Sequence, residues 1–365
     1  MSGKYHYPIT RPYIPKMVDE DLFNLILDSS TAYCLDRDKA VSGPSPEEFF
    51  YREARACEKL LKKILSTRHP LFGIHKTADL AALKPTVLGY RLLDSLQGEV
   101  AEREALLPLH EINPYLGLLF DAFSDWKDHY SNQHLIAGPI QEISNVCTWL
   151  NARIDQLKKT AETSSFKKSN QRFLHSANKN YRSVCHYTRS LFDRHSRLLV
   201  IRVDLWYVDV AARMLHGEHY SDVKRDLECF LNSMRTNKIF RNKVGFITKV
   251  EHGTCRGFHI HGIFFYDGSK SAHDIFIAKQ IGEFWKKVTN GRGHYWNCNA
   301  QKYKHRGIGQ ISHSETQLRH NLEKYVLAYV TKVDRFTRIV LPNGDRALRR
   351  GIVTGRRSTR GRPRA

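Results

Sequence analysis

Two apolar runs joined by a short turn constrain the fold of this chain more than any other feature. The runs "KVGFITKVEH" (residues 243–252) and "FHIHGIFFYDG" (residues 258–268) are rich in the β-branched and aromatic residues that strands favour. The intervening "GTCRG" is bounded by glycines, which suit a tight turn. The pattern predicts an antiparallel β-hairpin.

Two histidines, His259 and His261, interrupt the second run. Because side chains alternate along a strand, both should point to one face of the sheet, whereas Phe258, Ile260 and Phe264 should point to the other. One face is then core, and the other carries imidazoles. With 19 His in the chain, about one His-x-His pair is expected by chance, so a half-exposed pair without a chemical role is the alternative interpretation.

The segments around the hairpin predict an α+β domain. We expect helices over residues 170–196, 221–236 and 273–289, a strand over residues 197–210, a second strand near residues 306–312, and a last helix that begins at residue 314. A small antiparallel sheet with helices packed against it is an α+β architecture.

The chain changes in composition near residue 165. Before it, segments 45–66 and 87–109 repeat apolar residues at spacings of three and four, which predicts a mostly helical domain over residues 1–165. The sequence then turns polar and loses this period, so we place a domain boundary there. The second domain covers residues 166–335. No motif in residues 1–165 indicates a role for the first domain.

Positive charge is concentrated in the second part of the chain. The net charge of +21 divides into −3 for residues 1–165, with 19 basic and 22 acidic residues, and +24 for residues 166–365, with 39 basic and 15 acidic residues. Residues 336–365 predict a disordered basic tail, since residues 347–365 carry seven Arg and no acid. Such a surface neutralises phosphates, so we expect a nucleic-acid partner; a merely solubilising basic surface is the alternative.

Cysteine spacing and hydropathy indicate the compartment. Seven Cys, an odd number without a CxxC pair, argue against a disulfide framework and against a zinc ribbon. No continuous apolar run reaches the roughly 18 residues of a membrane span, and the N-terminus lacks the apolar core of a signal peptide. We therefore expect a cytoplasmic protein without a membrane partner.

A carboxylate on the first strand of the hairpin adds to the two imidazoles. Glu251 ends the run "FITKVE", where strand pairing should bring its side chain near His259 and His261. Two neutral nitrogens and a carboxylate oxygen form a three-ligand set that leaves positions for water or substrate. Such a set suits Mn²⁺ or Mg²⁺ at a phosphate. His252 is the alternative third ligand, because a bulge in the turn would reverse the alternation.

The last predicted helix carries the other candidate site residues. Ser314 and Gln317 match a capping box, which would start the helix. Five residues then follow on one stripe at spacings of three and four: Leu318, Leu322, Tyr325, Tyr329 and Lys332. A core stripe that ends in an exposed Lys is the alternative interpretation, and Tyr-x-x-x-Tyr is expected about once by chance in a chain with 17 Tyr.

These features together resemble a known family. "GFHIHGIFF" (residues 257–265) resembles the His-hydrophobic-His motif of HUH endonucleases. "YVLAYVTK" (residues 325–332) is similar to the Tyr-x-x-x-Tyr-x-x-Lys helix of the two-tyrosine replication initiators of small single-stranded DNA phages. The run "HSRLLVIRVDLWY", followed by the hairpin, is similar to the YagK/YfjJ-type domain of inovirus and prophage replication proteins. The resemblance covers roughly residues 170–335.

The resemblance implies a fold and a set of site residues. The HUH strand would lie at the centre of an antiparallel sheet, faced by the tyrosine helix. The family's roles fall on metal ligands His259, His261 and Glu251, on nucleophiles Tyr325 and Tyr329, and on Lys332 beside them. The implied cofactor is a divalent metal, Mn²⁺ or Mg²⁺.

The resemblance also implies a reaction. The protein would nick single-stranded DNA at a phage or plasmid origin in a bacterial host cell, form a covalent 5′-phosphotyrosine and free a 3′-hydroxyl for rolling-circle replication. No GxxxxGK[ST] phosphate loop is present, so a host helicase and DNA polymerase would be partners. A related HUH relaxase or transposase, or a non-catalytic DNA-binding prophage regulator, are the alternatives.

Overall fold

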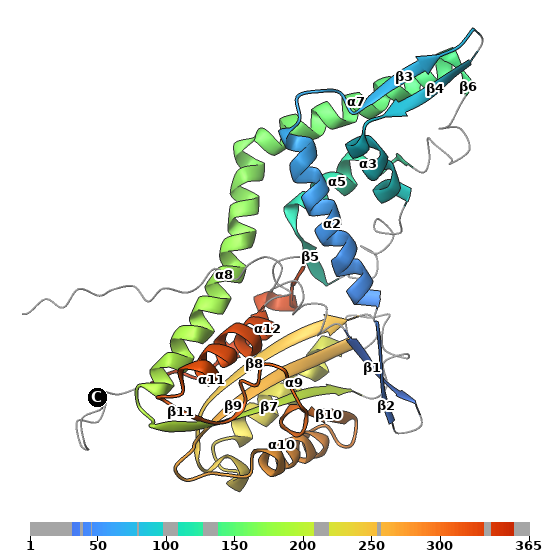
Figure 1. Ribbon diagram of the computed structural model, residues 1–365. Helices are drawn as coiled ribbons and strands as arrows, with labels where there is room; N and C mark the ends of the chain where they lie inside the picture. Colours follow the sequence, from blue (N-terminus) through green and yellow to red (C-terminus); the bar gives the residue numbers. More distant parts are fainter. Residues whose placement is uncertain are drawn as a thin grey trace, which may run out of the picture.

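The computed structural model (Figure 1) describes residues 31–36, 39–44, 46–78, 80–97, 109–126, 138–207, 219–253, 257–331 and 337–353. In these ranges helices pack on antiparallel sheets, so the predicted α+β class is confirmed. None of the helices described here combines the length and the apolarity needed to cross a bilayer.

A six-stranded antiparallel sheet forms the centre of the second part of the chain. Its strands are β7 (Arg197–Tyr207), β8 (Lys243–Gly253), β9 (Gly257–Asp267), β10 (Gly293–Asn297), β11 (Gly309–Ser312) and β13 (Leu348–Arg350). The order is β10-β7-β9-β8-β13, and β11 also pairs with β7. The predicted hairpin is confirmed, since β8 and β9 pair antiparallel up to Gly253 and Gly257. The strand that carries both histidines therefore lies between β7 and β8.

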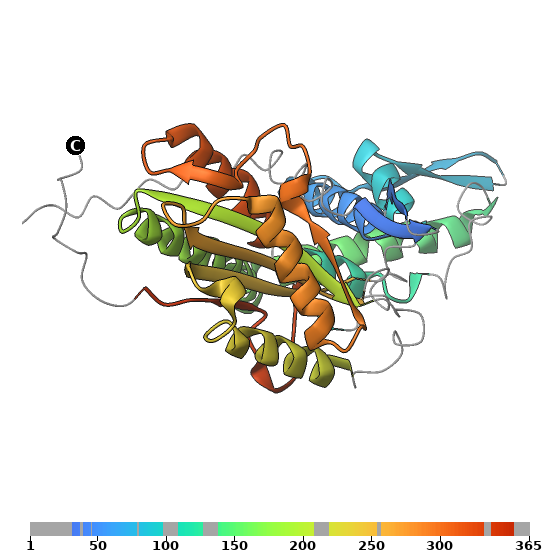
Figure 2. The same cartoon turned by 90° about the horizontal axis from the view of Figure 1, so that it is seen from below.

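Helices cover both faces of this sheet, as Figures 1 and 2 show from two sides. One face carries α9 (His219–Ser233) and α10 (Asp274–Val288); the other carries α8 (Ser164–Phe192), α11 (Thr316–Asn321), η4 (Leu322–Leu327) and α12 (Ala328–Thr331). Alternation along β9 explains both layers. Ile260 and Phe264 pack into the core with α9 and α10, whereas Ile263 and Phe265 pack into the core with α8 and η4.

The first part of the chain has a core of its own. Its helices are α2 (Pro46–Ser66), α3 (Val87–Gln97), α5 (Pro114–Ala122) and α7 (Ile140–Glu162), and its strands are β1 (Thr31–Asp36), β2 (Lys39–Pro44), β3 (Phe72–Lys76), β4 (Leu80–Pro85), β5 (His110–Ile112) and β6 (Gly138–Pro139). Two small sheets, β1-β2 and β3-β4-β6, accompany the helices. The helical period did not indicate them, because strands of two to six residues leave little periodic signal.

The long helix α8 connects the two parts. Thr163 caps it by accepting the backbone N–H of Phe166 at 3.2 Å, so the polar stretch near residue 165 is the start of a helix. Phe166 packs against the first core, while Val184 and Leu191, further along α8, belong to the core beneath the sheet. The change in composition therefore marks the solvent-exposed start of α8.

The expectation of a disordered tail over residues 336–365 is wrong for residues 337–353. β12 (Thr337–Ile339) pairs with β5 of the first part, and β13 adds an edge strand to the central sheet beside β8. Ile339 and Leu341 are buried in the core with α9 and α10. The many arginines of this segment predicted disorder. Its two strands are only three residues long, and their partner strands lie far away along the chain, so no local pattern indicated them. The rest of the predicted tail lies outside the described residues.

Candidate functional site

Three side chains that can bind a metal meet on one face of the central sheet. Glu251 of β8 lies directly opposite His259 of β9, and His261 follows two residues later on the same face. One ligand atom from each residue can be chosen so that all three lie within 4.8 Å of one another. Oε2 of Glu251 is 3.6 Å from Nε2 of His259 and 3.3 Å from Nε2 of His261. The structure thus brings together the three residues predicted as metal ligands.

His252, the alternative third ligand, lies on the opposite face. The pairing of β8 with β9 stays regular from Gly245 to Gly253, so the alternation is not reversed before the turn. His252 is the partner of Phe258 in this register, and the two rings pack edge-on with centroids 4.8 Å apart. The geometry therefore selects Glu251.

Asp204 of β7 completes the group from the other side of β9. It is the cross-strand partner of His261, and its Oδ1 lies 2.9 Å from Nδ1 of that ring. Arg202 lies two residues earlier on the same face and forms an ion pair with Asp204 at 3.0 Å. On the far side of His261, Lys249 of β8 is its other cross-strand neighbour and is buried.

Sequence reasoning missed Arg202, Asp204 and Lys249. One signal was present: Arg202 and Asp204 are charged residues two apart inside the apolar run "RLLVIRVDLWY". Charges at that spacing in a buried strand share one face and need partners there. The residues that they contact depend on which strands lie beside this one in the sheet, and local sequence patterns do not show the strand order.

Charged and titratable side chains of opposite sign alternate in this buried group and shift one another's pKa values. Burial alone would raise the pKa of Glu251, but the adjacent His261 and His259 hold that pKa well below its usual range. Burial would likewise raise the pKa of Asp204, and Arg202 and His261 lower it strongly. Burial would lower the pKa of His261, yet the Asp204 and Glu251 carboxylates raise it above its usual value. Both carboxylates are therefore ionised.

The donor set fits a divalent cation. Nδ1 of His259 lies 3.1 Å from the carbonyl oxygen of Gly257, and Nδ1 of His261 lies against Asp204. If both Nδ1 atoms donate to these oxygens, both Nε2 atoms present lone pairs toward Glu251, which is the arrangement of metal-binding histidines held by oxygen acceptors. Among the described residues, the buried Oε1 of Glu251 has no hydrogen-bond donor. A cation held by the three ligands would give that oxygen a partner.

The predicted tyrosine helix is an unusual helix. It begins at Thr316, and Glu315 caps it without a side-chain hydrogen bond, so the capping box of Ser314 and Gln317 is wrong. The carboxylate of Glu315 instead accepts the backbone N–H of Ser312 at 2.5 Å, and the amide of Gln317 donates to Asn321 at 3.0 Å. The segment Leu322–Leu327 (η4) is a π-helix, which widens the turn between two α-helical stretches.

The wide turn separates the two tyrosines. The ring of Tyr329 stands edge-on against the ring of His261, with centroids 5.0 Å apart, and the guanidinium of Arg202 lies 4.0 Å from the centroid of Tyr329. Tyr325 instead stacks flat on His305, at a centroid distance of 4.3 Å and an interplanar angle of 7°. The structure therefore places Tyr329 at the cluster, whereas Tyr325 packs against a loop. Lys332 lies outside the described residues.

An ion pair fixes the π-helical segment to α8. Nε and the Nη2 atom of Arg189 donate to the two carboxylate oxygens of Glu323 at 2.7 Å and 2.6 Å. The hydroxyl of Tyr181 donates to the carbonyl oxygen of Glu323 at 3.4 Å, and the backbone N–H of Ala328 donates to the same carbonyl, which is the π-helical bond. Two-point Arg–carboxylate pairs are geometrically specific. This one holds the turn that precedes Tyr325 and Tyr329.

Comparison with known proteins gives no relative to reason from: no protein-family model, no curated protein and no solved structure matches this chain. The function must therefore be inferred from the residues and geometry of the site.

Proposed function

We propose that this chain is a metal-dependent endonuclease of the HUH type that cuts single-stranded DNA with a tyrosine nucleophile. The contact of Tyr329 with His261, one of three clustered ligand residues, carries the proposal. Taken alone, the cluster of ligand residues or the tyrosine helix could be explained as an ordinary part of the packing. A phenol beside a mixed nitrogen and oxygen metal-ligand set is what phosphoryl transfer to tyrosine requires.

Glu251, His259 and His261 would hold the metal, Mn²⁺ or Mg²⁺. When bound, a divalent cation at this position supplies charge withdrawal from a phosphate. Two neighbouring side chains support this role, since Asp204 contacts the ring of His261 and Arg202 forms an ion pair with Asp204. Other first-row divalent ions would compete for the same ligands in vitro.

The chain's own residues would carry the covalent step. The phenolic oxygen of Tyr329 forms a bond to phosphorus while the bond from phosphorus to the 3′-oxygen of the preceding nucleotide breaks. The phenolic proton passes to solvent, and the 3′-oxygen takes up a proton. A phenol ionises poorly near neutral pH, so the guanidinium of Arg202 over the Tyr329 ring would stabilise the phenolate. Lys332, expected three residues further on, would act on the same charge.

The products suit replication. The strand is held as a 5′-phosphotyrosine, which conserves the phosphodiester energy for rejoining, and the free 3′-hydroxyl is a primer. Tyr325, four residues from Tyr329, would provide the second attack that releases a unit-length strand. We therefore propose initiation of rolling-circle replication in the cytoplasm of a bacterial host, with a host helicase and polymerase as partners. The net charge of +24 over residues 166–365 supports DNA as the substrate.

A covalent-adduct assay tests the proposal. The purified protein is incubated with Mn²⁺ and single-stranded DNA that spans the origin of its own replicon, and the products are separated on a denaturing protein gel. We expect a DNA adduct that requires metal and is lost in His259→Ala and in the Tyr325→Phe/Tyr329→Phe double variant. Tyr90→Phe, which alters an exposed tyrosine of α3, is the matched control and should retain the adduct.

If no adduct forms on any origin strand while the protein still binds that DNA in the presence of chelator, the catalytic proposal fails. A non-catalytic DNA-binding regulator is then the better description. A relaxase or a transposase would give the same adduct and would differ in the DNA sequence that it cuts.

A further inference from the structure

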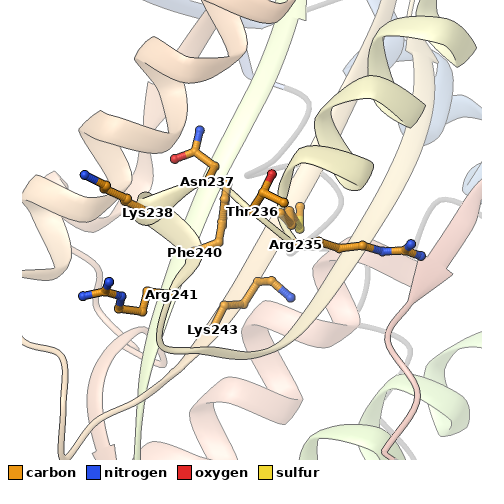
Figure 3. A pocket seen from close by; sticks show the side chains of 8 residues that line it. Arg235, Thr236, Asn237, Lys238, Phe240, Arg241 and Lys243 are labelled. Carbon is orange, nitrogen blue, oxygen red and sulfur yellow. The ribbon is translucent and has the colours of Figure 1, made fainter.

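A basic pocket lies at the other end of β8 from the metal-ligand cluster. It has a volume of about 510 Å³ and is formed where α9 ends, the short helix η2 (Lys238–Phe240) follows and β8 begins. Figure 3 shows the side chains around it. From Lys243 in its wall to Glu251 in the cluster, β8 extends over eight residues, or roughly 27 Å. The pocket is therefore separate from the candidate active site.

Four cations line the pocket, and none is neutralised within the part of the chain that the structure describes. They are Arg235, Lys238, Arg241 and Lys243. No Asp or Glu occurs in the sequence between Glu228 and Glu251. All four lie within nine residues of the sequence, so positive charge is concentrated on the lining of the pocket, and a bound anion would be attracted to it.

Of the four cations, the half-buried Lys243 would gain most from a bound anion. Burial is the cause that lowers the pKa of its ammonium group. Its Nζ atom lies 5.3 Å from the ring centroid of Phe246. A cation in this position gains more from a bound anion than a fully hydrated surface lysine does.

Apart from the four cations, the exposed residues that line the pocket are polar. Thr236 and Asn237 supply a hydroxyl and an amide, and Oδ1 of Asn237 accepts the backbone N–H of Ile239 at 3.0 Å, so its NH₂ group is the donor it can offer. The two apolar lining residues, Met234 and Phe240, are buried. The pocket therefore lacks the exposed apolar anchors that a protein partner would use. Two guanidinium forks and two ammonium groups match phosphate oxygens.

We propose that this pocket binds phosphate groups of a nucleic-acid backbone at a position remote from the cluster. That the phosphates belong to DNA rests on the proposed function. That the pocket binds phosphate rests only on the residues that line it. Such a contact holds the substrate without reading its bases. Its contribution is independent of metal and of both tyrosines.

Equilibrium binding of a labelled 30-nucleotide single strand, measured by fluorescence anisotropy in chelator, tests the proposal. The variant Arg235→Gln/Arg241→Gln is compared with Arg68→Gln/Arg91→Gln, which removes two exposed arginines from the first part of the chain. We expect the pocket variant to bind about tenfold more weakly at low salt and its salt slope to fall by about 1.4, as for two lost phosphate contacts on a single strand. The control should bind like wild type.

Equal affinity and equal salt slope in both variants would overturn the proposal. Lys238→Gln/Lys243→Gln gives a second, independent pair, and thermal melting shows whether each variant is folded. A fluorescent nucleoside triphosphate is titrated in parallel. If the pocket variant loses this nucleotide but keeps its affinity for the strand, the site takes free nucleotides and the backbone proposal is wrong.

The adduct assay is run on the same proteins. A pocket variant that binds DNA weakly yet forms the adduct at saturating DNA supports both proposals. If the pocket variant binds DNA more weakly but even the wild-type protein never forms the adduct, only the proposed nuclease activity is refuted. Normal binding by the pocket variant of an active nuclease would refute only the pocket.

Discussion

The ring of Tyr329 stands edge-on to the ring of His261, with centroids 5.0 Å apart and planes at 85°. Tyr325, four residues earlier, lies instead with its ring parallel to that of His305. Both tyrosines lie in or just after the π-helical segment Leu322–Leu327, whose wider turn alters the angle between successive side chains. The two phenols are therefore not equivalent.

This asymmetry predicts the order of attack. Tyr329→Phe should lower the rate of the first cleavage at least about 100-fold, equivalent to roughly 2.7 kcal/mol, because it removes the phenol whose ring contacts His261. Tyr325→Phe keeps the ring stacked on His305 and should change the first cleavage by less than about threefold, while reducing the second strand transfer. Adduct formation in a single turnover, followed by addition of a second labelled strand, separates the two steps. The reverse ranking would place Tyr325 at the scissile phosphate.

The contact between Asp204 and His261 predicts a role in metal affinity. Asp204→Asn should weaken Mn²⁺ binding about 10- to 100-fold, because it disturbs the acceptor that orients the ring of His261, a proposed ligand. Asp226→Asn is the matched control: Asp226 is also a buried carboxylate, but it pairs with Arg292 at 2.8 Å and accepts from Tyr207 at 3.2 Å. Isothermal titration of both proteins with Mn²⁺ measures the difference. An unchanged affinity in Asp204→Asn would show that Asp204 serves only the fold.

The raised pKa of His261 predicts the pH dependence of metal binding. Its ring keeps a proton to a pH above its usual value near 6.5, and a metal must displace that proton. The apparent Mn²⁺ affinity should therefore fall about tenfold for each pH unit below this pKa and level off above it. In Asp204→Asn the levelling should move to lower pH, because one of the two carboxylates that raise the pKa is gone. An affinity that does not vary with pH would argue that His261 is not a ligand.

The ion pair between Arg189 and Glu323 predicts an effect on chemistry without an effect on metal binding. Arg189→Met should slow adduct formation about tenfold, since the π-helical turn before Tyr325 and Tyr329 loses its link to α8. Mn²⁺ affinity should stay within about twofold, because the three proposed ligands belong to β8 and β9. The control is Arg153→Met, which breaks an ion pair with Asp125 in the first part of the chain. Equal rates in the two variants would contradict a positioning role for Arg189.

Much of the sheet was predictable from local patterns. The alternation in "GFHIHGIFF" placed His259 and His261 on one face, and the glycines around the turn predicted the pairing of β8 with β9. That pairing also put Glu251 opposite His259. These features were visible because each depends on residues less than about twenty positions apart.

The helix near the site was predicted less well, for a local reason. The stripe of Leu318, Leu322, Tyr325 and Tyr329 assumed 3.6 residues per turn, and the π-helical segment breaks that period. An i to i+5 hydrogen bond leaves no signature in the spacing of apolar residues. Tyr329 and Tyr325 thus appear on one stripe in the sequence but contact different partners, His261 and His305.

By itself, the sequence determined the alternation of side chains along each strand, the concentration of basic charge and the placement of His259 and His261 on one face, whereas the choice between Glu251 and His252 as their neighbour came from the structure. Only the tertiary structure decided that β7 lies beside β9, so that Asp204 and Arg202 support the site, and that β12 and β13 join sheets whose other strands lie far away along the chain. The reason is physical. Alternation is fixed by the covalent backbone of each strand, whereas the choice of neighbour is made by long-range packing and hydrogen bonding between segments.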